Sequence, residues 1–369
     1  MCVIAGYSGN RRAAPILIDM LRKIEYFDSG APTGIVTIHE GKLYVAKTLG
    51  NVDMLLKMTD AINLPGTTGL IHSRPGADLI NTCHPYIDDS GKYAVMENGT
   101  LAGTGNEDFF AEMRTIMDDL YDRGVVAPVS RDKLFELGYS RLAHTKDGKP
   151  FYPICSPYSL GIGDAVKDTP KEELKTALAN ATKAMHERIP TDTVSVGVHA
   201  DLPDTITICT VTRPMSVLEA DGETFIASCA IAFPEDLEGK LTHLVPCSLS
   251  QVTPNGLEIL ATELKGVRVE HMNDRILSMY TDAIVDQMSK KPTSLYEFKH
   301  PEGVWSEPMV DCDRFVREGS KLKPDMHAVY QVLYRLYKEG RLTYFTDLIY
   351  GRDVTWPARD MYLTKFKVD

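Results

Sequence analysis

Short apolar runs separated by glycine dominate the first 110 residues, and their composition predicts strands. In this part we expect strands at 2–5, 33–39, 43–46, 68–72 and 93–96, and a helix at 53–62. Runs rich in Val, Ile and Thr return later in the chain. They predict strands at 194–199, 205–212, 225–232 and 241–246, and a hairpin around Pro254-Asn255-Gly256 within 251–260.

The pattern between these two blocks changes to helical spacing. Apolar residues recur every three or four positions, which predicts helices at 108–122, 132–142 and 171–188. The stretch 147–163 is rich in Gly and Pro and is expected to be a loop. Blocks of strands, helices and strands favour antiparallel sheets with segregated helices over alternating βαβ units.

The last hundred residues have a different pattern. Helical spacing predicts helices at 271–287 and 324–339, and a strand pair follows at 341–349 and 358–366. Helix 324–339 and the strand pair resemble the end of a winged-helix module. We therefore divide the chain into a main unit, 1–260, and an α+β tail, 261–369.

The composition and charge of the chain argue against several functional classes. The 369 residues have a net charge of -11, and the acidic excess lies in the first 260 residues, whereas the tail is neutral. No nucleic-acid or membrane partner is therefore expected, and the tail is predicted to be an interaction module. The seven cysteines form no CxxC pair and the histidines are scattered, so we expect a reducing cytoplasmic location, no metal and no cofactor.

Cys2 is the first candidate for chemistry because it follows the initiator Met1. Removal of Met1 would leave the thiol beside its own α-amino group, whose reference pKa of roughly 7.7–8.0 suits a general base. One residue would then supply nucleophile and base. The alternative is a small buried side chain in the first strand.

Two further motifs supply groups that such a nucleophile needs. Arg74 ends the strand after His72, and its planar guanidinium can clamp a carboxylate; the alternative is a surface arginine. Asn98-Gly99 ends another strand and offers a side-chain amide and a backbone N–H for an oxyanion. The alternative there is a type I′ hairpin turn.

The order of these motifs resembles the class II glutamine amidotransferase family, closest to the glutaminase domain of glucosamine-6-phosphate synthase. The resemblance covers about residues 1–260, with a poorly matched stretch at about 103–200. It rests on the motifs Met1-Cys2-Val3-Ile4, His72-Ser73-Arg74, Asn81-Thr82-Cys83-His84-Pro85, Glu97-Asn98-Gly99 and Gly222-Glu223-Thr224-Phe225-Ile226-Ala227-Ser228. The fold that it implies is an α+β, N-terminal-nucleophile (Ntn) four-layer αββα sandwich, followed by the small α+β tail.

The resemblance also implies roles. Cys2 would attack the glutamine side-chain amide and form a γ-glutamyl thioester, while Asn98 and Gly99 hold the oxyanion. Arg74 would bind the α-carboxylate, with His72 assigned to the same pocket. Asp132, in Ser130-Arg131-Asp132-Lys133, is the nearest match to the aspartate that binds the α-amino group.

The departures from the family keep other functions open. Val3 replaces a glycine, Pro75-Gly76-Ala77-Asp78 replaces Trp-Ala-Thr-His-Gly, and Glu97 replaces a histidine. An Ntn hydrolase for another amide, or a non-catalytic binding module, are the alternatives. About a hundred residues follow the main unit, so the sugar-isomerase domains of the best-known members are not expected. The ammonia acceptor is unspecified, and a homo-oligomer stays open.

Overall fold

Two antiparallel sheets form the centre of the molecule. The computed structural model describes residues 2–27, 30–74, 83–100, 107–125, 143–144, 150–151, 156–265, 273–298, 325–349 and 361–368, and the structural statements below concern these residues. The seven-stranded sheet has the order β13 (Lys240–His243), β11 (Ser216–Ala220), β12 (Glu223–Ala227), β1 (Val3–Ser8), β4 (Thr68–Ser73), β2 (Thr33–His39), β3 (Lys42–Thr48). The six-stranded sheet has the order β15 (Gly256–Ala261), β14 (Ser248–Thr253), β10 (Ile206–Thr210), β9 (Asp192–His199), β6 (Tyr93–Thr100), β5 (Tyr86–Ile87).

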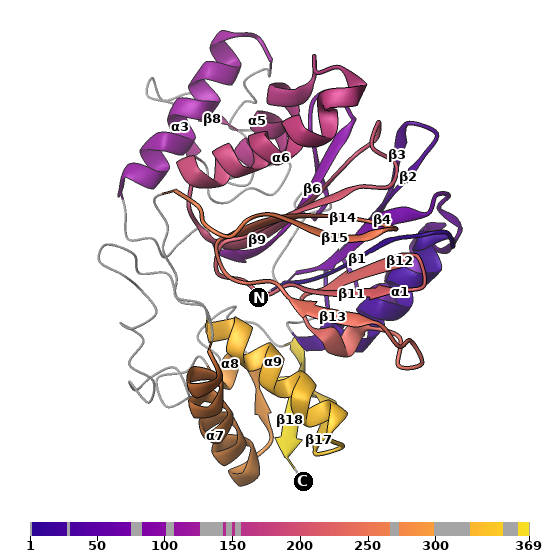
Figure 1. Cartoon of the computed structure of the whole chain (residues 1–369), viewed down its shortest axis with the longest axis vertical. Helices are drawn as coiled ribbons and strands as arrows, with labels where there is room; N and C mark the ends of the chain where they lie inside the picture. Colours follow the sequence, from indigo (N-terminus) through magenta and orange to yellow (C-terminus); the bar gives the residue numbers. More distant parts are fainter. Residues whose placement is uncertain are drawn as a thin grey trace.

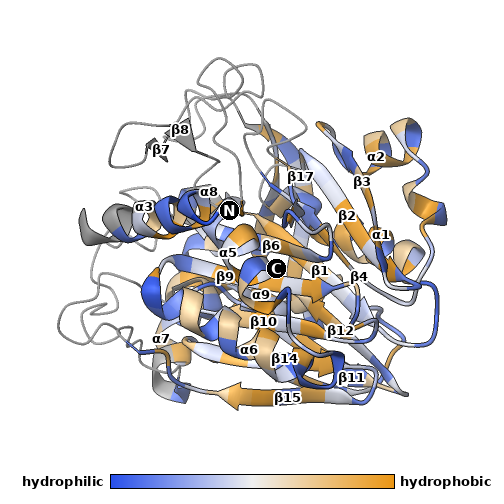
Figure 2. Cartoon of the chain, turned by 90° about the horizontal axis from the view of Figure 1, so that it is seen from above, coloured by the Kyte–Doolittle hydropathy of each residue, from blue (hydrophilic) through white to orange (hydrophobic). Residues whose placement is uncertain are grey.

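The two sheets pack face to face through an apolar layer. Ile4 and Leu70 from the first sheet share this layer with Ala94 and Met96 from the second. Figure 2 shows how apolar residues concentrate along strands such as β1 and β4. Because side chains alternate along a strand, the positions two residues further along each strand point into the same layer.

Helices cover the outer faces of the sandwich (Figure 1). The six-stranded sheet is covered by α3 (Glu107–Asp122), α5 (Ser156–Val166) and α6 (Lys171–Arg188), which share a core with Tyr93 and Val95 of β6. The seven-stranded sheet is covered by α1 (Ala13–Ile24). The expected four-layer αββα arrangement is therefore confirmed.

Short elements complete the main unit. They are η1 (Glu25–Phe27), α2 (Val52–Met58), η2 (Ala61–Asn63), the β7–β8 pair (Ala143–His144 and Pro150–Phe151) and η4 (Ala230–Ala232). None of the helices in the described ranges is long and apolar enough to cross a membrane.

The tail is a small α+β unit. Its elements are α7 (Asp274–Lys290), β16 (Thr293–Ser294), α8 (Leu295–Phe298), α9 (Asp325–Lys338), β17 (Leu342–Ile349) and β18 (Met361–Val368), with sheet order β16-β18-β17. The predicted helix and strand pair are confirmed. The element order and the pairing of β16 with β18 also agree with the resemblance to a winged helix.

A shared core joins the tail to the main unit. Phe366 of β18 lies edge-on to Phe27 of η1, with ring centroids 4.9 Å apart, and both rings are buried. Tyr330 and Leu333 of α9 belong to the same core as Leu21 of α1. Helix α9 is buried over most of its surface, so its apolar residues serve packing against the main unit.

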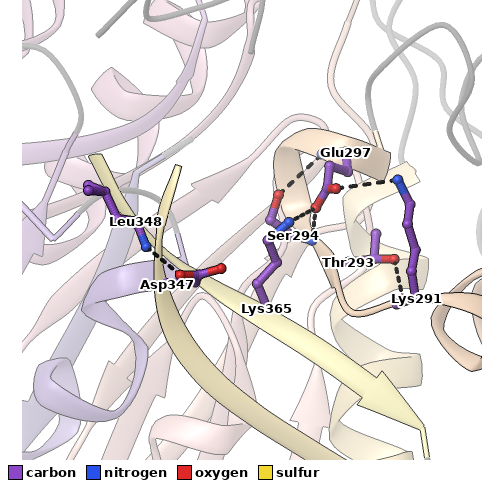
Figure 3. A network of polar contacts seen from close by, with 7 residues as sticks. All are labelled: Lys291, Thr293, Ser294, Glu297, Asp347, Leu348 and Lys365. Atoms are coloured by element: carbon purple, nitrogen blue, oxygen red, sulfur yellow. Dashed lines mark hydrogen bonds and ion pairs between the residues drawn. The ribbon is translucent and has the colours of Figure 1, made fainter. Parts of the chain in front are cut away.

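A polar network fixes the start of α8 (Figure 3). The Glu297 carboxylate accepts the Ser294 backbone N–H at 2.7 Å and pairs with Lys365 Nζ at 2.6 Å, while Ser294 Oγ accepts the Glu297 N–H at 3.4 Å. This reciprocal arrangement is a capping box. Lys291 lies 3.5 Å from the same carboxylate, so Glu297 ties α8 to both β18 and the end of α7.

The structure differs from the sequence-based expectations at three places. Helix α1 occupies a stretch, 13–24, for which no element was predicted. Helix α5 occupies much of the predicted loop 147–163. Its glycines allow close packing: a Cβ on Gly161 would lie 2.5 Å from Met185 Cε. Asn98-Gly99 lies within β6 and pairs with β9, so the hairpin-turn alternative fails. The predicted helix 132–142 lies outside the described residues.

Candidate active site

Cys2 directly precedes the central strand β1, at one end of the sandwich. Val3 pairs with Ser73, so continuing the register by one residue places Cys2 opposite Arg74. Cys2 has an exposed fraction of 8% and lies on the same strand face as Ile4, toward the second sheet. Ser228 Oγ accepts the Ile4 N–H at 3.0 Å and fixes this strand.

Asn98 reaches Cys2 from the other sheet. The backbone N–H of Cys2 donates to Asn98 Oδ1 at 3.0 Å. This bond sets the orientation of the amide, because the oxygen must face the donor. Asn98 is fully buried, and its Nδ2 has no hydrogen-bond partner among the described residues. A buried amide donor thus lies beside the cysteine with its hydrogen-bonding capacity unused.

Gly99 occupies a position that excludes a side chain. Its φ is +150°, and a Cβ there would lie 2.0 Å from the Asp192 carbonyl oxygen. Strand β6 can therefore approach β9 only with glycine at this point. Asp192 is itself ion-paired with Arg213, so the strand that flanks Gly99 is held firmly.

Arg74 directly follows β4. Its backbone N–H donates to the Pro32 carbonyl at 3.1 Å, and its Nη1 donates to Tyr86 Oη at 3.2 Å. The side chain is half-buried. Its guanidinium therefore lies at the same end of the sheet as Cys2, in a position from which it could meet an anionic group.

Two buried imidazoles support this region. His72 Nε2 donates to the Glu97 carbonyl at 3.0 Å, which ties β4 to the residue before Asn98. The His72 and His84 rings lie 4.2 Å apart. Burial lowers the pKa of His72 to about 3 and the pKa of His84 well below its usual value, so both rings are neutral.

The cysteine that neighbours this cluster is poorly suited to nucleophilic attack. Cys83 is fully buried, and burial raises the pKa of its thiol to about 11. Burial likewise raises the pKa of Cys229 to about 12. Across the described ranges, no group of three or more His, Cys, Asp or Glu side chains could hold a metal ion.

Five of the residues predicted from the sequence thus lie together at one end of the sandwich: Cys2, His72, Arg74, Asn98 and Gly99. Asp132 lies outside the described residues. Sequence reasoning missed one contributor, Tyr86, which accepts a hydrogen bond from Arg74. Tyr86 directly follows the quoted Cys83-His84-Pro85 motif and could have been noticed there.

Comparisons with known proteins identify relatives of this chain. A glutamine–fructose-6-phosphate aminotransferase (isomerizing) from Pyrococcus horikoshii is 37% identical over 106 residues, which is 27% of this chain and 17% of the relative. The protein of the same name from Synechocystis is 28% identical over 274 residues, 73% of this chain and 38% of the relative. The chain thus spans well under half the length of these relatives. No protein-family model matches it.

The fold comparison finds a solved structure of similar fold. The glutamine phosphoribosylpyrophosphate amidotransferase of B. subtilis superposes with a TM-score of 0.52 at 14% identity, over 79% of this chain and 58% of that structure. In sequence and in fold the chain is therefore similar to enzymes of the class II glutamine amidotransferase family.

Proposed function

We propose that this chain hydrolyses the side-chain amide of glutamine through a thioester on Cys2 and supplies the ammonia to an acceptor. The observation that supports this most directly is the pairing of Cys2 with Asn98, whose Oδ1 accepts the Cys2 N–H at 3.0 Å. Removal of Met1 would turn that nitrogen into a free amine held beside the thiol.

The proposed reaction uses the groups in sequence. The Cys2 amine takes the thiol proton, and the sulfur attacks the amide carbon. Asn98 Nδ2 and the Gly99 N–H stabilise the oxyanion. The C–N bond then breaks, and the amine returns the proton so that ammonia leaves. Water cleaves the thioester, which gives glutamate and restores the thiol.

Substrate recognition in this proposal centres on Arg74. The register places it opposite Cys2, and a guanidinium binds a carboxylate with two parallel hydrogen bonds. His72, fully buried against Glu97 and His84, would support the pocket wall. Binding of the α-amino group by Asp132 stays a prediction.

The test is the intact mass of the purified protein with and without 6-diazo-5-oxo-norleucine, a glutamine mimic that alkylates such nucleophiles. We expect loss of the Met1 mass and one adduct that maps to Cys2, absent from Cys2→Ala. Retained Met1 without an adduct would contradict the proposal and favour a non-catalytic binding module. Met1 removed without an adduct would indicate an Ntn hydrolase for another amide.

A further inference from the structure

A short segment of chain crosses the seven-stranded sheet beside the site and contacts Arg74. We call residues Cys83–Tyr86 the strap. The strap passes over β2 at Gly34, where a Cβ would lie 1.9 Å from the His84 carbonyl oxygen. Only glycine permits this crossing, so the path of the strap over the sheet is tightly defined.

Lys47 holds the strap from one side. It lies at the end of the edge strand β3 and pairs with Gly34. Its Nζ donates to the Cys83 carbonyl at 2.9 Å and to the Pro85 carbonyl at 2.7 Å. The two carbonyls flank His84, so one ammonium fixes the strap on both sides of that residue.

Ring contacts link the strap to the site. The His84 ring contacts that of His72, with centroids 4.2 Å apart, and meets that of Tyr86 edge-on, with centroids 4.4 Å apart. Tyr86 Oη then accepts the hydrogen bond from Arg74 Nη1 at 3.2 Å. The direction of the guanidinium is therefore linked to the strap, and the strap is linked to Lys47.

We propose that Lys47 is a positioning residue for substrate recognition: by holding the strap it places Tyr86, which orients Arg74 to bind the carboxylate of the amide substrate. This inference rests on the proposed function for the identity of the substrate. Lys47 acts at a distance, through two backbone carbonyls and one tyrosine. Its loss should therefore weaken substrate binding and leave the thioester chemistry intact.

The charge state of Lys47 supports the same role. Burial lowers the pKa of Lys47 to about 8. The ammonium, which donates more strongly than the neutral amine, is thus present at neutral pH and is lost above it. Arginine at this position would stay charged.

The experiment compares Lys47→Met, Lys47→Arg and Tyr86→Phe with the wild type, and uses Lys42→Met as the control. Lys42 is an exposed lysine at the other end of the same strand. We expect Lys47→Met and Tyr86→Phe to raise KM for glutamine about tenfold and to change kcat less than about threefold, the scale for weakening one charged hydrogen bond. Lys47→Arg should restore most of the lost affinity, and Lys42→Met should behave as wild type.

A second readout does not depend on glutaminase activity. Iodoacetate carries a carboxylate and iodoacetamide does not, so the ratio of their alkylation rates at Cys2 reports a correctly placed Arg74. Lys47→Met and Tyr86→Phe should lower this ratio several-fold while the iodoacetamide rate stays constant. An unchanged ratio and an unchanged KM in the folded Tyr86→Phe variant would overturn the inference. Wild-type protein that shows the ratio effect without glutamine turnover would overturn the proposed substrate instead.

Discussion

The Cys2 backbone nitrogen and the Asn98 side-chain oxygen lie 3.0 Å apart although the residues are 96 positions apart in the chain. The contact joins the first strand of one sheet to the end of a strand in the other. It fixes the nitrogen proposed as the base and directs Asn98 Nδ2 away from that nitrogen. In the proposed reaction one amide therefore serves two roles, acceptor for the base and donor for the oxyanion.

Asn98→Asp separates these roles. The carboxylate can still accept from the Cys2 nitrogen but has no N–H for the oxyanion. We expect kcat for glutamine hydrolysis to fall about 10²- to 10³-fold, with a small change in KM. Steady-state kinetics check this, and Asn255→Asp, at an exposed hairpin position, is the matched control. A kcat within threefold of wild type would remove Asn98 from the oxyanion site.

Gly99→Ala tests whether the close approach of β6 to β9 is needed for catalysis. The new Cβ would meet the Asp192 carbonyl at 2.0 Å, so the end of β6 must move and take the Asn98 amide with it. We expect at least a tenfold loss of kcat and a destabilisation of about 1–3 kcal/mol. Activity assays measure the loss of kcat, and urea unfolding measures the loss of stability.

Gly91→Ala is the control for the backbone effect alone. Gly91 has a φ of +71°, but a Cβ there has nothing within 4 Å. It should cost about 1 kcal/mol of stability and leave kcat unchanged. If Gly99→Ala behaves in the same way, the contact with Asp192 has no catalytic importance.

From the sequence, the candidate residues of this site could be predicted better than the contacts that hold them in place. Cys2, Arg74 and Asn98 stand in short motifs at strand ends, and the sheet register brings such ends together. Lys47 could not be found in this way because it binds two backbone carbonyls, and any residue has a carbonyl. Helix α5 was missed because its glycines, which permit close packing, are also typical of loops.

Glu25 is a buried carboxyl group that should lower stability near neutral pH. Its Oε2 accepts the Val52 N–H at 3.0 Å at the start of α2, and burial raises its pKa from 4.5 to about 7. The folded protein therefore holds this proton more tightly than the unfolded chain, so stability falls as the pH rises from about 4.5 to 7. The charged form costs up to about 3 kcal/mol above that range.

Glu25→Gln keeps an acceptor for Val52 and removes the charge. We expect the variant to be more stable than wild type by about 2–3 kcal/mol at pH 8 and nearly equal to it at pH 4.5. Urea unfolding at the two pH values measures this difference. The exposed Glu40→Gln serves as the control. If Glu25→Gln raises the free energy of unfolding at pH 8 by no more than the control does, the result would contradict a buried charge at Glu25.

Buried histidines should make the protein sensitive to acid. Burial lowers the pKa of His327 to about 3 and of His186 to about 4, as it does for His72 and His84. Above the unfolded-state pKa of about 6.5 these histidines are neutral in both states and cost the folded protein no stability. As the pH falls below that value, the unfolded chain takes up protons that the folded protein does not, and the free energy of unfolding decreases progressively. Each would remove about 2 kcal/mol by pH 5, against a total stability of about 5–15 kcal/mol.

His327→Gln isolates one of these groups. His327 lies on α9 and is 1% exposed. Wild type should lose about 2 kcal/mol more than the variant between pH 7 and pH 5, which urea unfolding at both values would show. His39→Gln, at a partly exposed site, controls for the substitution itself. Equal pH dependence in wild type and His327→Gln would mean that His327 is protonated without cost.

The contact between Phe366 and Phe27 predicts that the tail and the main unit unfold together. Phe366→Ala should remove about 3–5 kcal/mol, because both rings are buried in a core that spans the two parts. Phe345→Ala, on the neighbouring strand and 48% exposed, should cost less than about 1 kcal/mol.

Both tryptophans, Trp305 and Trp356, belong to the tail, so their fluorescence reports the tail while far-ultraviolet circular dichroism reports the whole chain. We expect the two thermal transitions to coincide, and we expect Phe366→Ala to lower both transition temperatures together. A fluorescence transition that precedes the dichroism transition would instead describe a tail that unfolds independently.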